Sequence, residues 1–348
     1  MRPRAEALAD LLAAAVDSEG AEALSALSGR PLAVVAVEDA GAIREGASDL
    51  RAGAPILVGV DAEGLTPGGV ADLFDILLTT ADRPPSPWVS VGRGGLDAAL
   101  SSLEATTTRC PVAAAVFATV LRLGDQLDFE GALTLESLAY STLLGGRDFR
   151  AWRAGRPARE RVLPDGPLVR LERRDEVYVI TLARPEARNA IGARLRDELA
   201  DALRLARLDP SMTRVELRGE GPCFSAGGDL DEFGQAGDLA LAHIIRSQRS
   251  PVRLVDRLGE RIQVFIQGAA IGGGIEIAAA AAKLVADQGA VFRLPEVGMG
   301  LIPGAGGTAS LPRRIGRHRT CFMGLSGQDI GAVQALDWGL ADRLEVVP

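Results

Sequence analysis

Apolar positions in the second half of the chain alternate between the spacing typical of helices and that of buried strands. Apolar side chains recur every four residues from Ile191 to Leu203 while charged residues take the opposite face, which predicts a helix over residues 191–208. Short apolar runs surround this helix and predict strands at residues 177–182, 213–217, 263–267 and 284–286, with a second helix at residues 275–282. Strands that alternate with helices indicate an α/β fold with a largely parallel sheet.

The first half of the chain has a less regular pattern. It predicts an amphipathic helix over residues 1–30, a strand at residues 32–37, and a β-turn-α unit at residues 55–78, in which the apolar stretch 70–78 has the length of a helix. Residues 96–152 predict several helices. Residues 153–167 contain three prolines, two glycines and many charges, as linkers do. We therefore predict two domains, residues 1–157 and residues 168–348.

The composition is that of a folded, soluble protein. Apolar residues make up 47% of the 348 residues, and the net charge of −8 argues against a general nucleic-acid or anionic-membrane surface. Three widely spaced cysteines and two histidines disfavour a disulfide framework and structural zinc, so no metal site is expected. The apolar stretch at residues 11–16 is too short for a signal peptide or a membrane span. We expect a cytoplasmic protein without nucleic-acid or membrane partners.

Two glycine-rich loops each follow a predicted strand. They read Cys-Phe-Ser-Ala-Gly-Gly-Asp at residues 223–229 and Gln-Gly-Ala-Ala-Ile-Gly-Gly-Gly-Ile-Glu at residues 267–276. Glycine lets backbone N–H groups approach a ligand, and paired N–H groups can form an oxyanion hole, which stabilises a negatively charged oxygen. The alternative is that both loops are tight turns without a ligand. Neither loop has the glycine spacing of a nucleotide-binding loop.

Glu276 and Glu296 are the candidate acid–base residues. Glu276 lies in the first turn of an otherwise apolar helix, where a buried carboxylate needs a partner or a function, and helix capping is the alternative role. For Glu296, the alternative is a surface ion pair with Arg293. Two carboxylates over one oxyanion hole could hold a water molecule and move protons at neutral pH. The histidines are expected in packing roles, with His318 on a solvated basic face.

Four segments, in order, resemble those of a known family. They are residues 182–190 (Leu-Ala-Arg-Pro-Glu-Ala-Arg-Asn-Ala), residues 224–230, residues 267–276, and residues 294–308 (Leu-Pro-Glu-Val-Gly-Met-Gly-Leu-Ile-Pro-Gly-Ala-Gly-Gly-Thr). Together they resemble the enoyl-CoA hydratase/isomerase (crotonase) superfamily over roughly residues 168–346. The resemblance implies a spiral of ββα units that binds an acyl-CoA thioester, with the thioester carbonyl between the N–H groups of Gly228 and Gly273.

The resemblance also implies a binding role for residues around these loops. Those on the CoA side of the site would be Ala187, Ala226 and Asp229, with Arg184 and Arg188 as cations for the CoA phosphates. CoA would arrive as part of the substrate, and no separate cofactor is implied.

The pair of glutamates favours hydration among the reactions of this family. In the implied mechanism, Glu276 orients and deprotonates a water molecule, and Glu296 delivers a proton to the α-carbon of an α,β-unsaturated thioester. Three alternatives stay open. They are a carbon–carbon bond hydrolase acting on a β-diketone or opening a ring, an enoyl-CoA isomerase, and a non-catalytic binding or assembly protein.

Some segments depart from the family pattern. Bulky residues at Gln263, Phe265 and Gln267 replace the usual proline and small residues, and Ala282 replaces an aspartate. The C-terminal helices of typical members are expected to be missing. Residues 96–152 resemble those helices. Residues 55–81 resemble a degenerate copy of the unit that leads to the triple glycine. We therefore expect the N-terminal half to be a degenerate crotonase-like repeat that supplies lid helices. The resemblance also implies a homo-oligomer, either a trimer or a hexamer.

Overall fold

A six-stranded sheet lies at the centre of the C-terminal half. The computed structural model describes residues 22, 24–28, 31–37, 55–157, 159 and 164–347, and in it the strand order is β13-β10-β8-β7-β6-β5. The strands are β5 (Val169–Arg174), β6 (Val177–Leu182), β7 (Arg214–Gly219), β8 (Ile262–Ile266), β10 (Lys283–Ala286) and β13 (Arg343–Leu344). All neighbours are parallel except β5 and β6, so the predicted, largely parallel α/β sheet is confirmed.

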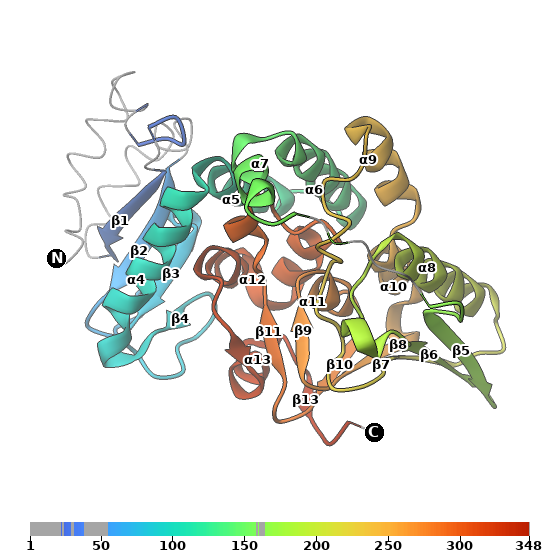
Figure 1. Cartoon of the computed structure of the whole chain (residues 1–348). Coiled ribbons are helices and arrows are strands. Elements are labelled where there is room, and N and C mark those ends of the chain that lie inside the picture. Colours follow the sequence, from blue (N-terminus) through green and yellow to red (C-terminus); the bar gives the residue numbers. More distant parts are fainter. Residues whose placement is uncertain are drawn as a thin grey trace.

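Helices and a smaller sheet complete this half of the molecule (Figure 1). The helices are α8 (Ala193–Leu208), α9 (Leu239–Gln248), α10 (Pro251–Leu258), α11 (Gly273–Ala278), α12 (Gly307–Ser326) and α13 (Ala332–Trp338). The smaller sheet has the order β12-β11-β9, made by β9 (Ala269–Ile271), β11 (Val291–Arg293) and β12 (Ile330–Gly331). The helix predicted at residue 191 begins two residues later, because Ile191 forms a β-bridge with Gly228.

The N-terminal half contains a four-stranded parallel sheet followed by four helices within the described ranges. The strands lie in sequence order: β1 (Leu32–Ala36), β2 (Ile56–Asp61), β3 (Ile76–Thr79) and β4 (Val89–Ser90). The helices are α4 (Gly92–Arg109), α5 (Pro111–Gly124), α6 (Phe129–Leu144) and α7 (Arg147–Ala154), which confirms the helical prediction for residues 96–152. The helix predicted over residues 1–30 lies largely outside the described residues.

The helix predicted over residues 70–78, and with it the β-turn-α unit, is wrong. The segment forms a single 3₁₀ turn, Ala71–Leu73, followed by strand β3. Ile76, Leu77 and Leu78 are fully buried within the sheet. A short apolar run that is buried on both faces has no periodicity to separate a strand from a helix.

One hydrophobic cluster runs through both halves of the chain. It includes Leu103 and Phe117 from the N-terminal helices together with Leu311 of α12, and α12 packs against α4, α5, α6 and α11 (Figure 1). The predicted boundary between residues 157 and 168 therefore does not divide the core. The two-domain division and the degenerate repeat stay predictions, while the contacts of α6 with α9 and α12 bring this N-terminal helix to the C-terminal half.

Polar contacts join the two halves as well. Nη1 of Arg317 on α12 lies 3.8 Å from Oδ1 of Asp75 and donates to the carbonyl oxygen of Phe74 at 2.9 Å. His318 donates to the carbonyl oxygen of Ala71 at 2.8 Å. His318 is therefore buried at this junction rather than on a solvated face as predicted, and burial lowers its pKa.

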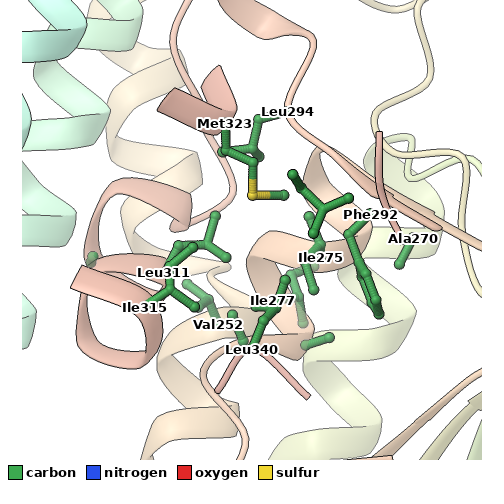
Figure 2. Packing of buried hydrophobic residues seen from close by; sticks show 14 of the residues in the cluster. Val252, Ala270, Ile275, Ile277, Phe292, Leu294, Leu311, Ile315, Met323 and Leu340 are labelled. Carbon is green, nitrogen blue, oxygen red and sulfur yellow. The ribbon is translucent and has the colours of Figure 1, made fainter. Parts of the chain in front are cut away.

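The core also fixes the backbone around Glu276. Its neighbours Ile275 and Ile277 belong to the same buried cluster as Leu311 and Ile315 of α12 (Figure 2). The short helix α11 is therefore anchored on both sides of the glutamate.

No helix within the described ranges is both long enough and apolar enough to cross a membrane.

Candidate active site

The two predicted glycine-rich loops lie against each other. Ser225 forms a β-bridge with Ala270, and the N–H of Ile271 donates to the carbonyl oxygen of Ser225 at 3.0 Å. Gly227 has a φ of +88°, and a Cβ at this position would lie 2.6 Å from the carbonyl oxygen of Ile271. Only glycine permits this approach of two backbones.

The contact places the two predicted N–H donors side by side. A Cβ on Gly273 would lie 3.8 Å from the backbone nitrogen of Gly228. Gly273 is the first residue of α11, so its N–H has no partner within the helix. Neither N–H has an acceptor among the described residues. The pair is therefore available to bind a ligand oxygen, as the prediction of an oxyanion hole requires.

A cavity of about 460 Å³ opens at this point. Five of the predicted site residues line it: Gly228, Asp229, Gly273, Glu276 and Glu296. Its other walls come from α6, α9 and α10, and include Leu133, Glu136, Tyr140, Leu144, Leu241, Ile245, Arg246 and Val252. The size and the mixture of apolar walls with a few polar groups suit a small-molecule site.

Glu276 points from α11 to the start of α12. Its carboxylate is buried, and its Oε2 accepts hydrogen bonds from the N–H groups of Ala305 at 2.7 Å and Gly307 at 2.9 Å. Burial raises the pKa of Glu276 to about 7, although these hydrogen bonds act in the opposite direction. A carboxyl group with a pKa near neutrality can serve as a general base.

Glu296 follows β11 and reaches the same place. A Cβ on Gly272 would clash with Oε1 of Glu296 and lie 3.9 Å from Oε1 of Glu276, so the two carboxyl groups flank one glycine. Burial and repulsion by Glu276 raise the pKa of Glu296 well above its usual range. Its Oε2 is buried without a hydrogen-bond partner among the described residues. The predicted alternative fails, because Arg293 pairs with Asp329 instead.

The pair Arg184 and Asp229 has a structural role. Arg184 is only 3% exposed, and its Nη1 lies 2.8 Å from Oδ2 of Asp229 and donates to the carbonyl oxygen of Ala190. The structure thus contradicts the expectation that Arg184 is a free cation for CoA phosphates, because its charge is neutralised inside the fold.

The remaining residues assigned to the CoA side lie outside the cavity lining. Arg188 is exposed, and its carbonyl oxygen accepts a hydrogen bond from the N–H of Ala226 at 2.8 Å. Ala187 and Ala226 are half-buried beside it. A role for Ala187, Ala226 and Arg188 in binding CoA stays a prediction.

Sequence reasoning missed Glu136 on α6. Its carboxylate is 2% exposed, lines the cavity and accepts three hydrogen bonds from Gly306 and Thr308. One signal was available: beyond the first turn of α6, Glu136 is the one carboxylate among positions that are mostly apolar or small. Its long-range partners, 170 residues away along the chain, were not predictable from spacing.

The C-terminal half of the chain matches known proteins. The family model for enoyl-CoA hydratase/isomerase matches residues 172–348, just over half of the chain. The chain belongs to the enoyl-CoA hydratase/isomerase family. The predicted resemblance is thereby confirmed, as is the crotonase-like α/β fold class of the C-terminal half, whereas the match does not include the N-terminal half with α6.

Individual members of the enoyl-CoA hydratase/isomerase family match the same half. An enoyl-CoA isomerase/hydratase, fer4, of Mycosarcoma maydis is 36% identical over 177 residues, which cover 48% of this chain and 65% of the relative. A probable enoyl-CoA hydratase of Bacillus subtilis (strain 168) is 36% identical over 180 residues, covering 49% and 68%. The chain thus spans about two thirds of the length of these relatives. The crystal structure of enoyl-CoA hydratase from Thermoplasma volcanium GSS1 matches with 31% identity and a TM-score of 0.47, over 52% of this chain and 72% of that one.

Proposed function

We propose that the protein adds water across the α,β-double bond of an enoyl-CoA thioester. The observation that supports this most strongly is a pair of buried carboxyl groups, Glu276 and Glu296, flanking Gly272 next to two unpaired N–H groups. Hydration needs a base, an acid and a site for negative charge, and these residues can supply all three.

The N–H groups of Gly228 and Gly273 would bind the thioester carbonyl oxygen. As water attacks the β-carbon, electrons move onto this oxygen and form an enolate, which the two donors stabilise. Donors that are fixed before the reaction starts need no rearrangement when the charge develops. The glycine contact between the two loops keeps them fixed here.

The two glutamates would divide the proton transfers. Glu276, partly ionised at neutral pH, takes a proton from the water whose oxygen bonds to the β-carbon. Glu296, whose raised pKa favours the protonated form, would give its proton to the α-carbon of the enolate. The product has gained one water molecule, and a proton passed from Glu276 to Glu296 restores the starting state. Different environments for two neighbouring carboxyl groups are the usual basis for such a division.

Three further predictions accompany this proposal. The substrate carries CoA, and the mechanism uses no other organic group. The family resemblance implies a homo-oligomer, a trimer or a hexamer, and a role in fatty acid metabolism. The cysteine pattern and the short apolar stretch near the N-terminus predict a cytoplasmic protein.

The test is a mass-spectrometric assay with enoyl-CoA thioesters of different chain lengths. Wild-type protein should give products heavier by one water molecule, and Glu276→Gln and Glu296→Gln should both lose this activity. Glu104→Gln, an exposed position on α4, is the matched control and should retain it. A product of unchanged mass would indicate isomerisation, a cleaved acyl chain would indicate a carbon–carbon hydrolase, and no turnover of any thioester would contradict the proposal.

A further inference from the structure

The segment at the start of α12 is held by two carboxylates in alternation. The N–H groups at positions 305 and 307 donate to Glu276, as described above. The N–H of Gly306 donates to Oε1 of Glu136 at 2.7 Å, and Thr308 donates its N–H and its hydroxyl to Oε2 at 2.7 and 2.8 Å. Four consecutive N–H groups therefore point alternately to Glu276 and to Glu136.

This arrangement makes the position of one carboxylate depend on the other. The first N–H groups of a helix have no partner within it, and a buried donor left unpaired is costly. If Glu136 were absent, two of the four donors would have no acceptor and the segment could turn about its own axis. The two donors that hold Glu276 lie on that same segment.

We propose that Glu136 is a positioning residue of the active site, supplied by the N-terminal half of the chain. It holds residues 305–308 so that their donors fix Oε2 of Glu276 and leave Oε1 on the side of Gly272, where Glu296 also lies. The kinetic part of this inference rests on the proposed hydration, whereas the geometric part does not.

The pKa of Glu276 gives the role a second, independent readout. Burial and the nearby carboxylate of Glu276 raise the pKa of Glu136 to about 8, so Glu136 is mostly protonated while Glu276 ionises. The hydrogen bonds from Ala305 and Gly307 lower the pKa of Glu276 against the effect of burial. If Glu136 no longer holds the segment, these hydrogen bonds should weaken and the pKa of Glu276 should rise. A residue that merely pins α6 to α12 would change stability without this effect.

Two variants separate position from charge. Glu136→Asp keeps the charge but draws the carboxylate back by one methylene, and Glu136→Gln removes the charge while keeping one accepting oxygen. Because small displacements of a catalytic group are costly, we expect kcat for enoyl-CoA hydration to fall by about 10–100-fold in both, with KM changed by less than about threefold. The acidic limb of the pH profile, which reports ionisation of Glu276, should move to higher pH in both variants, because the donors that lower the pKa of Glu276 are displaced in both. Glu104→Gln is the control for the substitution itself.

A titration without substrate completes the experiment. In protein labelled with ¹³C at the glutamate carboxyl carbon, the resonance of Glu276 is assigned by its loss in Glu276→Gln. Its pKa should rise in Glu136→Gln relative to wild type, because the hydrogen bonds from Ala305 and Gly307 that lower it are weakened. If wild type turns over no enoyl-CoA, the proposed hydration fails while this shift still supports the positioning role, and an unshifted titration overturns it.

The remaining outcomes are equally decisive. Wild-type kcat and an unshifted Glu276 titration in folded Glu136→Gln would overturn the inference, whatever the melting temperature. If Glu136→Gln does not fold, Glu136→Asp decides: a lower kcat at unchanged KM supports the role, and an unchanged kcat overturns it.

Discussion

Replacing Glu276 by glutamine removes the proposed base while leaving its surroundings nearly intact. The amide oxygen of glutamine can take over the place of Oε2 and accept from the N–H groups of Ala305 and Gly307. The NH₂ group then takes the place of Oε1 and presents hydrogen-bond donors on the side of Gly272. Water bound there would no longer face a group that can accept its proton.

The structure sets the size and the selectivity of the expected effect. A positioned general base contributes about 10²–10⁴-fold to a rate, which corresponds to about 2.7–5.5 kcal/mol in the barrier. We expect kcat of Glu276→Gln to fall by that factor, with little loss of stability because both hydrogen bonds are kept. Glu276→Ala should differ, since it leaves two buried N–H groups unpaired at a cost of about 1–3 kcal/mol each.

The assay is steady-state hydration of an enoyl-CoA at pH 8, together with thermal unfolding of each variant. The control Glu104→Gln should match wild type in both measurements. A folded Glu276→Gln variant that keeps more than about a tenth of wild-type kcat would refute the assignment of Glu276 as the base.

Three further predictions concern the loops, the junction and the pH dependence. Gly227→Ala should force the two glycine-rich loops apart, because its Cβ would lie 2.6 Å from the carbonyl oxygen of Ile271, and it should lower both kcat and the melting temperature. The control Gly331→Ala places its Cβ in open space and should change neither value. Equal effects of the two substitutions would contradict the contact between the loops. Asp75→Ala should lower the free energy of unfolding in urea by about 3–5 kcal/mol, because it leaves the half-buried Arg122 without its counter-ion and the buried N–H of Leu57 without its acceptor. Glu172→Ala at an exposed ion pair should have little effect. Burial raises the pKa of Glu276 from 4.5 to about 7, so the stabilising protonation is complete below pH 4.5 and is lost as the pH rises through 7. The melting temperature should thus fall between pH 5 and pH 8, and by less in Glu276→Gln; an equal fall would contradict the raised pKa.

Much of the site was predictable because its residues lie in local patterns. Glycine loops that follow strands can be read from the sequence, and they place Gly228 and Gly273 correctly at the cavity. The same holds for Glu276, a lone carboxylate in an apolar helix. The strands of the C-terminal half were predictable for a similar reason, since their apolar runs alternate with one strongly periodic helix.

Other features depend on contacts that no local pattern records. The segment at residues 76–79 is a strand because it pairs with β2 and β4 and is buried on both faces, whereas its apolar run alone fits a helix equally well. Arg184 looks like a free cation in sequence, but its partner Asp229 lies 45 residues later. Glu136 joins the site only because α6 packs against α12, so its role depends on the tertiary structure.

The most direct test of the central claim is the fate of oxygen from water. Wild-type protein is incubated with an enoyl-CoA in H₂¹⁸O, and the thioester product is analysed by tandem mass spectrometry. Hydration predicts one ¹⁸O atom as a hydroxyl on the β-carbon, absent in Glu276→Gln. Product without ¹⁸O, or with ¹⁸O only in a released carboxylate, would contradict the account.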